Sequence, residues 1–281
     1  MQRSGPTPAE GILVVIGVLI LYIVIGVTMH LLIGEAGILI TQVLVLLVPA
    51  LLFVRLRGYS FTRTFSLRRP TRRGLLGATL LMLGGLPIAW VFTWLQSFVL
   101  PVPVEMLEGL TEFLLTDDPL RIAWLVLLVA VTPAICEEFL FRGVLLSSFR
   151  GGWKTPTAII ASGLIFGAFH LSPETAFRFV PTAWLGILLA WIVVETRSIW
   201  TAVLLHFLNN GLILMLTLLP ATREMASDVD QDPPWLLIPV AILIFVAGIR
   251  VLRQEGRRLR EESDAEVGDP HPTDPESEAF T

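Results

Sequence analysis

Apolar runs about as long as a bilayer crossing recur along this chain of 281 residues, and they restrict its fold more than any other feature. A transmembrane helix needs about 20 consecutive apolar residues, and the first run, residues 11–33, exceeds that length. Hydrophobic residues make up 54% of the chain and charged residues only 16%, whereas roughly 25% of the residues of a soluble domain are charged. These proportions predict an integral membrane protein. Because the first run is too long for a signal-peptide core and lacks a small-residue cleavage pattern, we expect it to remain as a membrane helix.

The runs can be assigned to about eight membrane spans: residues 11–33, 38–54, 74–95, 120–149, 156–171, 176–194, 199–219 and 234–251. This pattern predicts an all-α fold, a polytopic transmembrane helix bundle. The fourth run is too long for one simple span. Thr132-Pro133 inside it suits the start of a second helix, with Thr as the N-cap and Pro at the first position, but a kink in one long helix is equally allowed.

The charges between the runs indicate how the bundle is oriented. Residues 55–73 contain seven arginines and no acid, so the positive-inside rule places this loop in the cytoplasm. Residues 101–118 are acidic and are expected outside, whereas the arginines between residues 250 and 260 follow the last run inside. Both termini are therefore predicted to be cytoplasmic. The net charge of -4 arises from residues 261–281, which hold eight acids and no Lys or Arg.

Three ionisable residues, Glu137, Glu138 and Arg142, stand in the apolar run that follows Pro133. Ionisable groups within a bilayer cost at least a few kcal/mol each, so they are usually paired and usually functional. Glu138 and Arg142 are four residues apart and can pair on one helix face. Glu137 lies about 100° round the helix and is free to act elsewhere. On this stretch alone, a structural ion pair and a catalytic group are equally good interpretations.

Two histidines and an asparagine, His170, His206 and Asn210, are the other notable polar groups deep in the spans. At about 1.5 Å per residue, Glu137 lies about 20 Å from Arg150, His170 about 21 Å from Pro156 and His206 about 12 Å from Ser198. A single intramembrane histidine is more often a packing residue than a ligand, but this group at compatible depths favours a common site. His206 and Asn210 are four residues apart and share a helix face.

Three motifs follow one another in order: Glu137-Glu138-x-x-x-Arg142, Phe166-x-x-x-His170 and His206-x-x-x-Asn210. Together they resemble the motifs of the CPBP intramembrane proteases, the CAAX prenyl endopeptidase and bacteriocin-processing family, over residues 119–219. The resemblance implies an intramembrane endopeptidase in which Glu137 takes a proton from water and His170 helps to position that water. It also implies that His206 and Asn210 offer donors to the oxyanion, and that Glu138 and Arg142 hold the motif helix in register.

The cofactor is left open by these motifs. A divalent metal, with zinc as a plausible ion, would be held by Glu137, His170 and His206, which leaves a position for water. A metal-free mechanism fits equally well, since the chain contains no H-E-x-x-H. In either case we expect Glu137, His170 and His206 to form one site, reached laterally or from the cytoplasm.

Two rival functions remain at this point. A proton-coupled transporter could use buried Glu, His and Arg as a relay, although we see no internal repeat of the transporter kind. A non-catalytic membrane binding or immunity protein could keep the fold without turnover. As partners we expect the lipid bilayer and a membrane protein or peptide substrate, and no nucleic acid. The oligomeric state and the natural substrate do not follow from the sequence.

The chain is expected to have four parts and to reside, as a multi-pass protein, in a bacterial plasma membrane. Residues 1–118 would form N-terminal helices with the arginine-rich loop, and residues 119–219 the catalytic core. Residues 220–252 would form an outer loop and the last span, and residues 253–281 a disordered acidic cytoplasmic tail with little to bury. The one cysteine, Cys136, excludes a disulfide within the chain and is expected to be an apolar packing residue.

Overall fold

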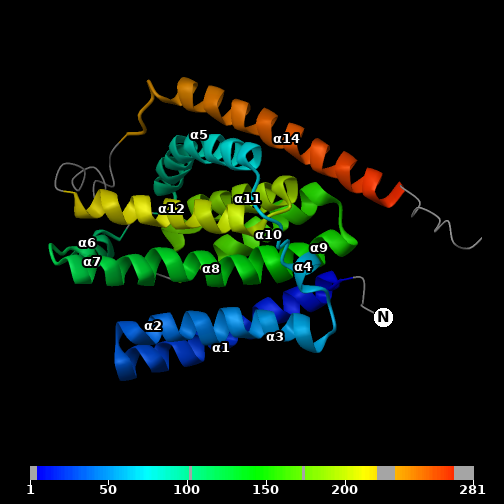
Figure 1. Ribbon diagram of the computed structural model, residues 1–281. Coiled ribbons are helices and arrows are strands. Elements are labelled where there is room, and N and C mark those ends of the chain that lie inside the picture. The colour runs from blue at the N-terminus through cyan, green and yellow to red at the C-terminus, as the bar shows by residue number, and fades with distance from the viewer. Residues whose placement is uncertain (1–4, 101–102, 173–174, 220–231, 269–281) are drawn as a thin grey trace, which may run out of the picture.

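A computed structural model describes residues 5–100, 103–172, 175–219 and 232–268, and these residues form a bundle of helices without a strand (Figure 1). The predicted all-α polytopic bundle is confirmed. In chain order the elements are α1 (Pro8–Ile33), α2 (Glu35–Thr41), η1 (Gln42–Leu47), α3 (Val48–Leu56), α4 (Phe61–Thr64), α5 (Arg72–Ser97), α6 (Val104–Leu114), α7 (Pro119–Leu125), η2 (Val126–Val131), α8 (Thr132–Glu138), η3 (Phe139–Leu145), α9 (Leu146–Gly152), α10 (Thr155–Phe169), η4 (Ala176–Arg178), α11 (Phe179–Thr196), α12 (Ile199–Leu218) and α14 (Ile238–Gly268).

Among the described residues, 6 helical stretches are long and apolar enough to cross a membrane: Pro8–Ile33, Glu35–Leu56, Arg72–Ser97, Pro119–Gly152, Ala176–Thr196 and Ile199–Leu218. The protein is therefore an integral multi-pass membrane protein. The fifth predicted span corresponds to α10, which has 15 residues and is shorter than the others. The eighth corresponds to the start of α14, where the apolar part ends at Arg250. Residues 220–231, which belong to the outer loop predicted before the last span, lie outside the described residues.

The fourth predicted span is one continuous helix that runs from Pro119 to Gly152. Thr132-Pro133 therefore does not begin a separate helix, and the alternative of one long helix is the one observed. Pro133 has no N–H to donate to the carbonyl four residues earlier, and the turn before it, η2, widens to π-helix geometry. The Thr132 hydroxyl donates to Leu127 O at 2.7 Å and stabilises this turn. Such widened turns are frequent beside functional sites.

Small residues bring α10 and α11 into close contact. Gly163 and Gly167 are four residues apart on α10, and they face Ile187 and Ala183 of α11. A methyl group added at Gly163 would lie 2.6 Å from the backbone nitrogen of Ile187, so a larger side chain would separate the helices. This small-xxx-small pattern lets membrane helices pack closely, and it places His170, at the end of α10, against the start of α11.

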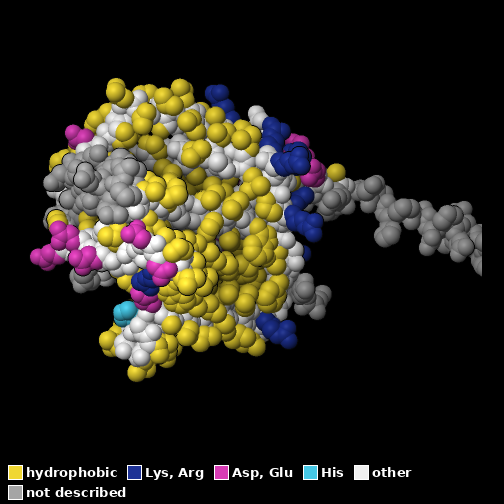
Figure 2. Space-filling view, turned by 60° about the vertical axis from the view of Figure 1, so that its left-hand side comes forward, with side chains coloured by type: hydrophobic (Ala, Val, Ile, Leu, Met, Phe, Trp, Pro, Cys, Tyr) yellow, Lys and Arg dark blue, Asp and Glu magenta, His cyan; other side chains and the backbone are white. Residues whose placement is uncertain are grey.

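The two ends of the bundle carry opposite charges. In Figure 2 a broad hydrophobic surface separates an edge with most of the visible Lys and Arg side chains from an edge with most of the visible Asp and Glu side chains. At the arginine edge, an isolated antiparallel bridge joins Leu67 to Ser198, and Ser198 Oγ donates to Arg68 O at 2.7 Å. The arginine-rich loop and the α11–α12 connection therefore lie at the same end. That this end is cytoplasmic stays a prediction.

The last helix, α14, packs along α5 and continues far beyond its apolar part (Figure 1). The prediction of disorder from residue 253 onward is therefore wrong as far as Gly268. Glu255, which is fully buried, accepts hydrogen bonds from Thr71 Oγ1 at 2.6 Å and from Arg258 at 2.9 Å. Thr71 comes from another part of the chain and Arg258 from α14 itself, and the composition of the tail alone could not reveal the contact with Thr71.

Candidate active site

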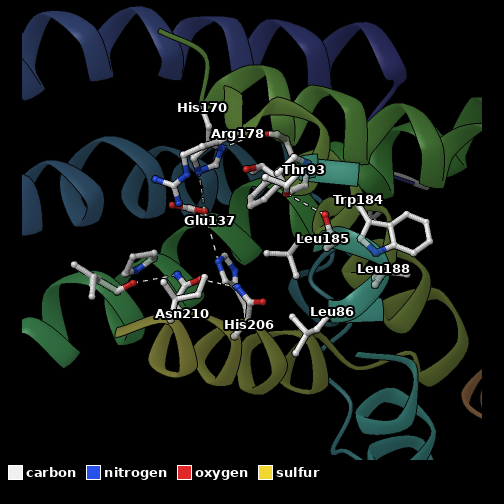
Figure 3. A pocket seen from close by; sticks show the side chains of 18 of the residues that line it. Leu86, Thr93, Glu137, His170, Arg178, Trp184, Leu185, Leu188, His206 and Asn210 are labelled. Atoms are coloured by element: carbon white, nitrogen blue, oxygen red, sulfur yellow. Dashed lines mark hydrogen bonds and ion pairs between the residues drawn. The ribbon is translucent and has the colours of Figure 1, made fainter. Parts of the chain in front are cut away.

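Glu137 lies in the middle of the bundle, between two histidines that come from other helices. It is the second-last residue of α8, whereas His170 caps the C-terminus of α10 and His206 stands on α12. Glu137 Oε2 is 3.7 Å from His170 Nε2 and 4.0 Å from His206 Nε2 (Figure 3). Glu137 is only 8% exposed and His206 only 2%, whereas the His170 side chain is 36% exposed. The structure thus brings together the three residues that the sequence places at similar depth.

Glu138 joins two of the predicted site residues through one oxygen. Its Oε1 lies 2.9 Å from an Arg142 guanidinium nitrogen, as the four-residue spacing predicts, and 2.9 Å from His206 Nδ1. The contact with His206 was not predicted. Because Glu138 Oε1 accepts a hydrogen bond from the Nδ1–H of His206, the neutral ring has its lone pair on Nε2, the nitrogen on the side of Glu137. Glu138 therefore fixes both the orientation and the tautomer of His206.

Arg142 is 1% exposed and is held from three sides. Besides the ion pair with Glu138, it donates to Gly186 O at 3.2 Å, and its guanidinium carbon lies 4.3 Å from the centre of the Phe166 ring. A cation over an aromatic face is stabilised by the ring quadrupole. The first residue of the second motif, Phe166, therefore packs against the last residue of the first motif.

His170 is oriented by its own helix. Its Nδ1 donates to Phe166 O at 2.8 Å, and a neutral ring then has its acceptor atom, Nε2, on the side of Glu137. Both imidazoles and the Glu137 carboxylate therefore direct acceptor atoms toward one another. A water molecule, with two hydrogens to donate, is chemically suited to the space between them.

Asn210 stands one turn after His206, but its amide is engaged. Its Nδ2 donates to Val129 O at 3.0 Å, and Asn209 Nδ2 donates to its Oδ1 at 3.1 Å. Val129 is the residue whose carbonyl would otherwise pair with the missing N–H of Pro133. Asn210 thus stabilises the widened turn, and at most one of its two N–H groups remains for a substrate.

These residues line a cavity of about 600 Å³ that lies between α5, α8, α11 and α12. Its walls are largely apolar, and it also reaches Phe113 of α6 and Arg178 of η4. The lining therefore belongs to the half of the bundle nearer the acidic edge. This position favours lateral access from the bilayer, which is one of the two expected routes, and access from the cytoplasm stays a prediction.

Arg178 is a cavity residue that the sequence reasoning missed. It is exposed in the structure, it lines the cavity, and its side chain points toward Glu137 beside His170 (Figure 3). A signal existed in the sequence, since Arg178 is a cation placed just inside the start of an apolar run. Its position between two motifs hid its relation to them.

Glu137, His170 and His206 are the residues predicted to hold a metal ion if one is used. In the part of the chain that the structure describes, no group of three or more His, Cys, Asp or Glu side chains is placed to hold a metal ion. One imidazole nitrogen of His206 is already used by Glu138. The other nitrogen of His206, Nε2, stays on the side of Glu137, as does His170 Nε2. The metal set of Glu137, His170 and His206 therefore stays a prediction, and no step below is routed through a metal.

Comparison with known families places the motifs in one domain. Residues 119–212 match the family described as type II CAAX prenyl endopeptidase Rce1-like. The matched segment contains all three motifs, from Glu137 to Asn210. No curated protein and no solved structure matches the chain. Residues 119–212 are therefore similar to the Rce1-like family, which agrees with the resemblance of the motifs to CAAX proteases.

Proposed function

We propose that this protein is an intramembrane endopeptidase that hydrolyses a peptide bond of a membrane-associated substrate in the manner of a CAAX endopeptidase. The observation that carries the proposal is the position of Glu137, a carboxylate in an apolar cavity with an imidazole on each side at 3.7 and 4.0 Å. The Rce1-like domain indicates an intramembrane endopeptidase. The mechanism, the substrate and the bacterial plasma membrane as its location are part of the proposal.

Glu137 acts as the general base in this mechanism. A water molecule held between Glu137 and His170 gives its proton to the carboxylate while its oxygen attacks the carbonyl carbon of the scissile bond. The tetrahedral intermediate then expels the amine, which takes the proton back from Glu137. His206, oriented by Glu138 and Arg142, keeps the attacking water and the carbonyl in register.

The cavity suits an apolar substrate. Its lining is mostly aliphatic and aromatic, and it lies within the part of the bundle that faces the hydrocarbon region. Pockets of about 300–1,000 Å³ bind small ligands and peptide segments. Candidate substrates are a prenylated C-terminal peptide, a bacteriocin precursor or another membrane protein. The substrate would bind in an extended conformation that places its scissile bond beside Glu137.

A cleavage assay tests the proposal. The purified protein in nanodiscs is incubated with fluorogenic peptides of the three candidate classes, and products are identified by mass spectrometry. The matched control is Glu137→Gln, which keeps the shape of the side chain and removes the base. We expect cleavage by the wild type, no more than about 1% of that rate for the variant because general bases contribute roughly 10²–10⁴-fold, and full activity in the presence of a chelator. Loss of activity with chelator would refute the metal-free mechanism and indicate that a metal ion takes part. Activity retained by Glu137→Gln would exclude Glu137 as the base.

A further inference from the structure

Arg178 is a permanent cation in the wall of a cavity that is otherwise lined by apolar and neutral polar side chains, Glu137 and two histidines. Its guanidinium makes no hydrogen bond or ion pair with any described residue. It interacts electrostatically with Glu137, toward which it points (Figure 3). A guanidinium has five N–H donors, and none of those of Arg178 is used by a described residue. The donors of Arg178 are therefore available to a group that enters the cavity.

The backbone of Arg178 is held in place, whereas its side chain has no hydrogen-bond or ion-pair partner among the described residues. Gln96 of α5 contacts both flanks, since its Nε2 donates to Ala176 O at 3.2 Å and its Oε1 accepts from Val180 N at 2.9 Å. Arg178 N donates to Thr175 O at 2.9 Å, and Thr175 Oγ1 donates to His170 O at 2.6 Å. Arg178 and His170 are therefore connected through one residue. This anchoring is what a preorganised site requires.

The donors expected for the oxyanion are largely used elsewhere. Asn210 donates to Val129 O, and the Nδ1 proton of His206 is directed to Glu138. Neutral His206 has only an acceptor on the cavity side. Of the residues that line the cavity, Arg178 is the one with several donors left and with a positive charge.

From these contacts we infer that Arg178 binds and stabilises the oxyanion of the tetrahedral intermediate, which makes it a further catalytic residue of the proposed peptidase. As the water oxygen bonds to the carbonyl carbon, the water proton passes to Glu137 and the carbonyl π electrons move to the carbonyl oxygen. Glu137 becomes neutral in the same step, so the negative charge moves from Glu137 to the carbonyl oxygen. Arg178, which faces Glu137 at rest, stabilises the charge in its new position. When the C–N bond breaks, the oxyanion returns its electrons, the amine takes the proton from Glu137, and the carboxylate charge of Glu137 is restored.

The inference rests on the proposed function and is tested with a peptide that the wild type cleaves. Arg178→Gln is compared with Arg178→Lys and with Arg63→Gln, a control that removes an exposed arginine from the arginine-rich loop. For each variant kcat and KM are measured across pH, together with the affinity for a phosphinate analogue of the cleaved peptide and for a non-cleavable N-methyl amide analogue. The phosphinate mimics the anionic intermediate, whereas the amide mimics the substrate.

We expect Arg178→Gln to lower kcat by about 10²–10³-fold, as does loss of one oxyanion donor in other enzymes, with KM changed less than about threefold. Phosphinate affinity should fall by a similar factor and amide affinity should not, whereas Arg178→Lys should keep part of the activity and Arg63→Gln all of it. Equal weakening of both analogues, or a rate for Arg178→Gln that recovers fully at alkaline pH, would overturn the inference, because Arg178 would then only bind substrate or keep Glu137 ionised. If the wild type cleaves no peptide, the proposed function fails and this inference fails with it. If the wild type is active and Arg178→Gln has the same kcat, only this inference fails.

Discussion

Replacing Arg142 by alanine tests whether the first motif is held together by a buried ion pair. Arg142 is 1% exposed and Glu138 is 0% exposed, and their charged atoms are 2.9 Å apart. Removing the arginine leaves the Glu138 carboxylate in a place that water does not reach. The only other partner of Glu138 Oε1 is His206 Nδ1, and Glu138 Oε2 has no hydrogen-bond partner among the described residues.

The expected loss follows from these contacts. Breaking a buried ion pair by removing one partner costs about 3–5 kcal/mol, because the remaining charge is uncompensated. The contact of Arg142 with the Phe166 ring at 4.3 Å is lost as well. For a protein of this size each kcal/mol shifts Tm by roughly 2–4 °C, so the variant should melt roughly 6–20 °C below the wild type. Turnover should also fall, because Arg142 no longer holds the Glu138 carboxylate that orients His206.

Thermal unfolding of the purified protein in detergent, followed by tryptophan fluorescence, measures this effect. The double variant Glu138→Gln/Arg142→Met removes both charges and should recover most of the lost stability, because the penalty belongs to the unpaired charge. Arg63→Ala, at an exposed position, should leave Tm unchanged. An Arg142→Ala protein that melts with the wild type would refute the structural role of the pair, and so would a double variant no more stable than Arg142→Ala.

The remaining predictions concern the site, the helix packing and the orientation. Glu137→Gln, His170→Ala and His206→Ala should each abolish most turnover and double variants should lose little more, since residues acting as a unit are not additive; kinetic losses that multiply would contradict a single site. Gly163→Ala should destabilise the α10–α11 contact by about 1–3 kcal/mol in a detergent unfolding assay, whereas Gly17→Ala, which meets nothing within 4 Å, should be neutral or slightly stabilising; equal Tm values would argue against the close packing. A cysteine introduced at Glu108 should react with an impermeant reagent in intact cells, and one at Arg63 only after permeabilisation. The wild type gives the unlabelled background, because Cys136 is buried, and labelling at Arg63 in intact cells would reverse the orientation.

Several features of this protein follow from short-range patterns in the sequence. The membrane helices follow from apolar runs of bilayer length, because a helix satisfies its own backbone hydrogen bonds wherever the surroundings are apolar. The pair of Glu138 and Arg142 follows from four-residue spacing on one helix. The common depth of Glu137, His170 and His206 follows from the constant rise of a helix. Each of these depends on residues within one element.

Contacts between helices were decided only by the tertiary structure. Three of these contacts join segments far apart in the chain. His206 donates a hydrogen bond to Glu138, and Asn210 donates one to Val129 O. Arg178 lies beside Glu137. In the charged part of α14, Glu255 accepts a hydrogen bond from Thr71, the N-cap of α5. Helix periodicity indicates which face a side chain occupies, but not which helix lies opposite or how that helix is rotated. Those two quantities are set by packing of the whole bundle, in which small residues such as Gly163 determine how closely the helices approach.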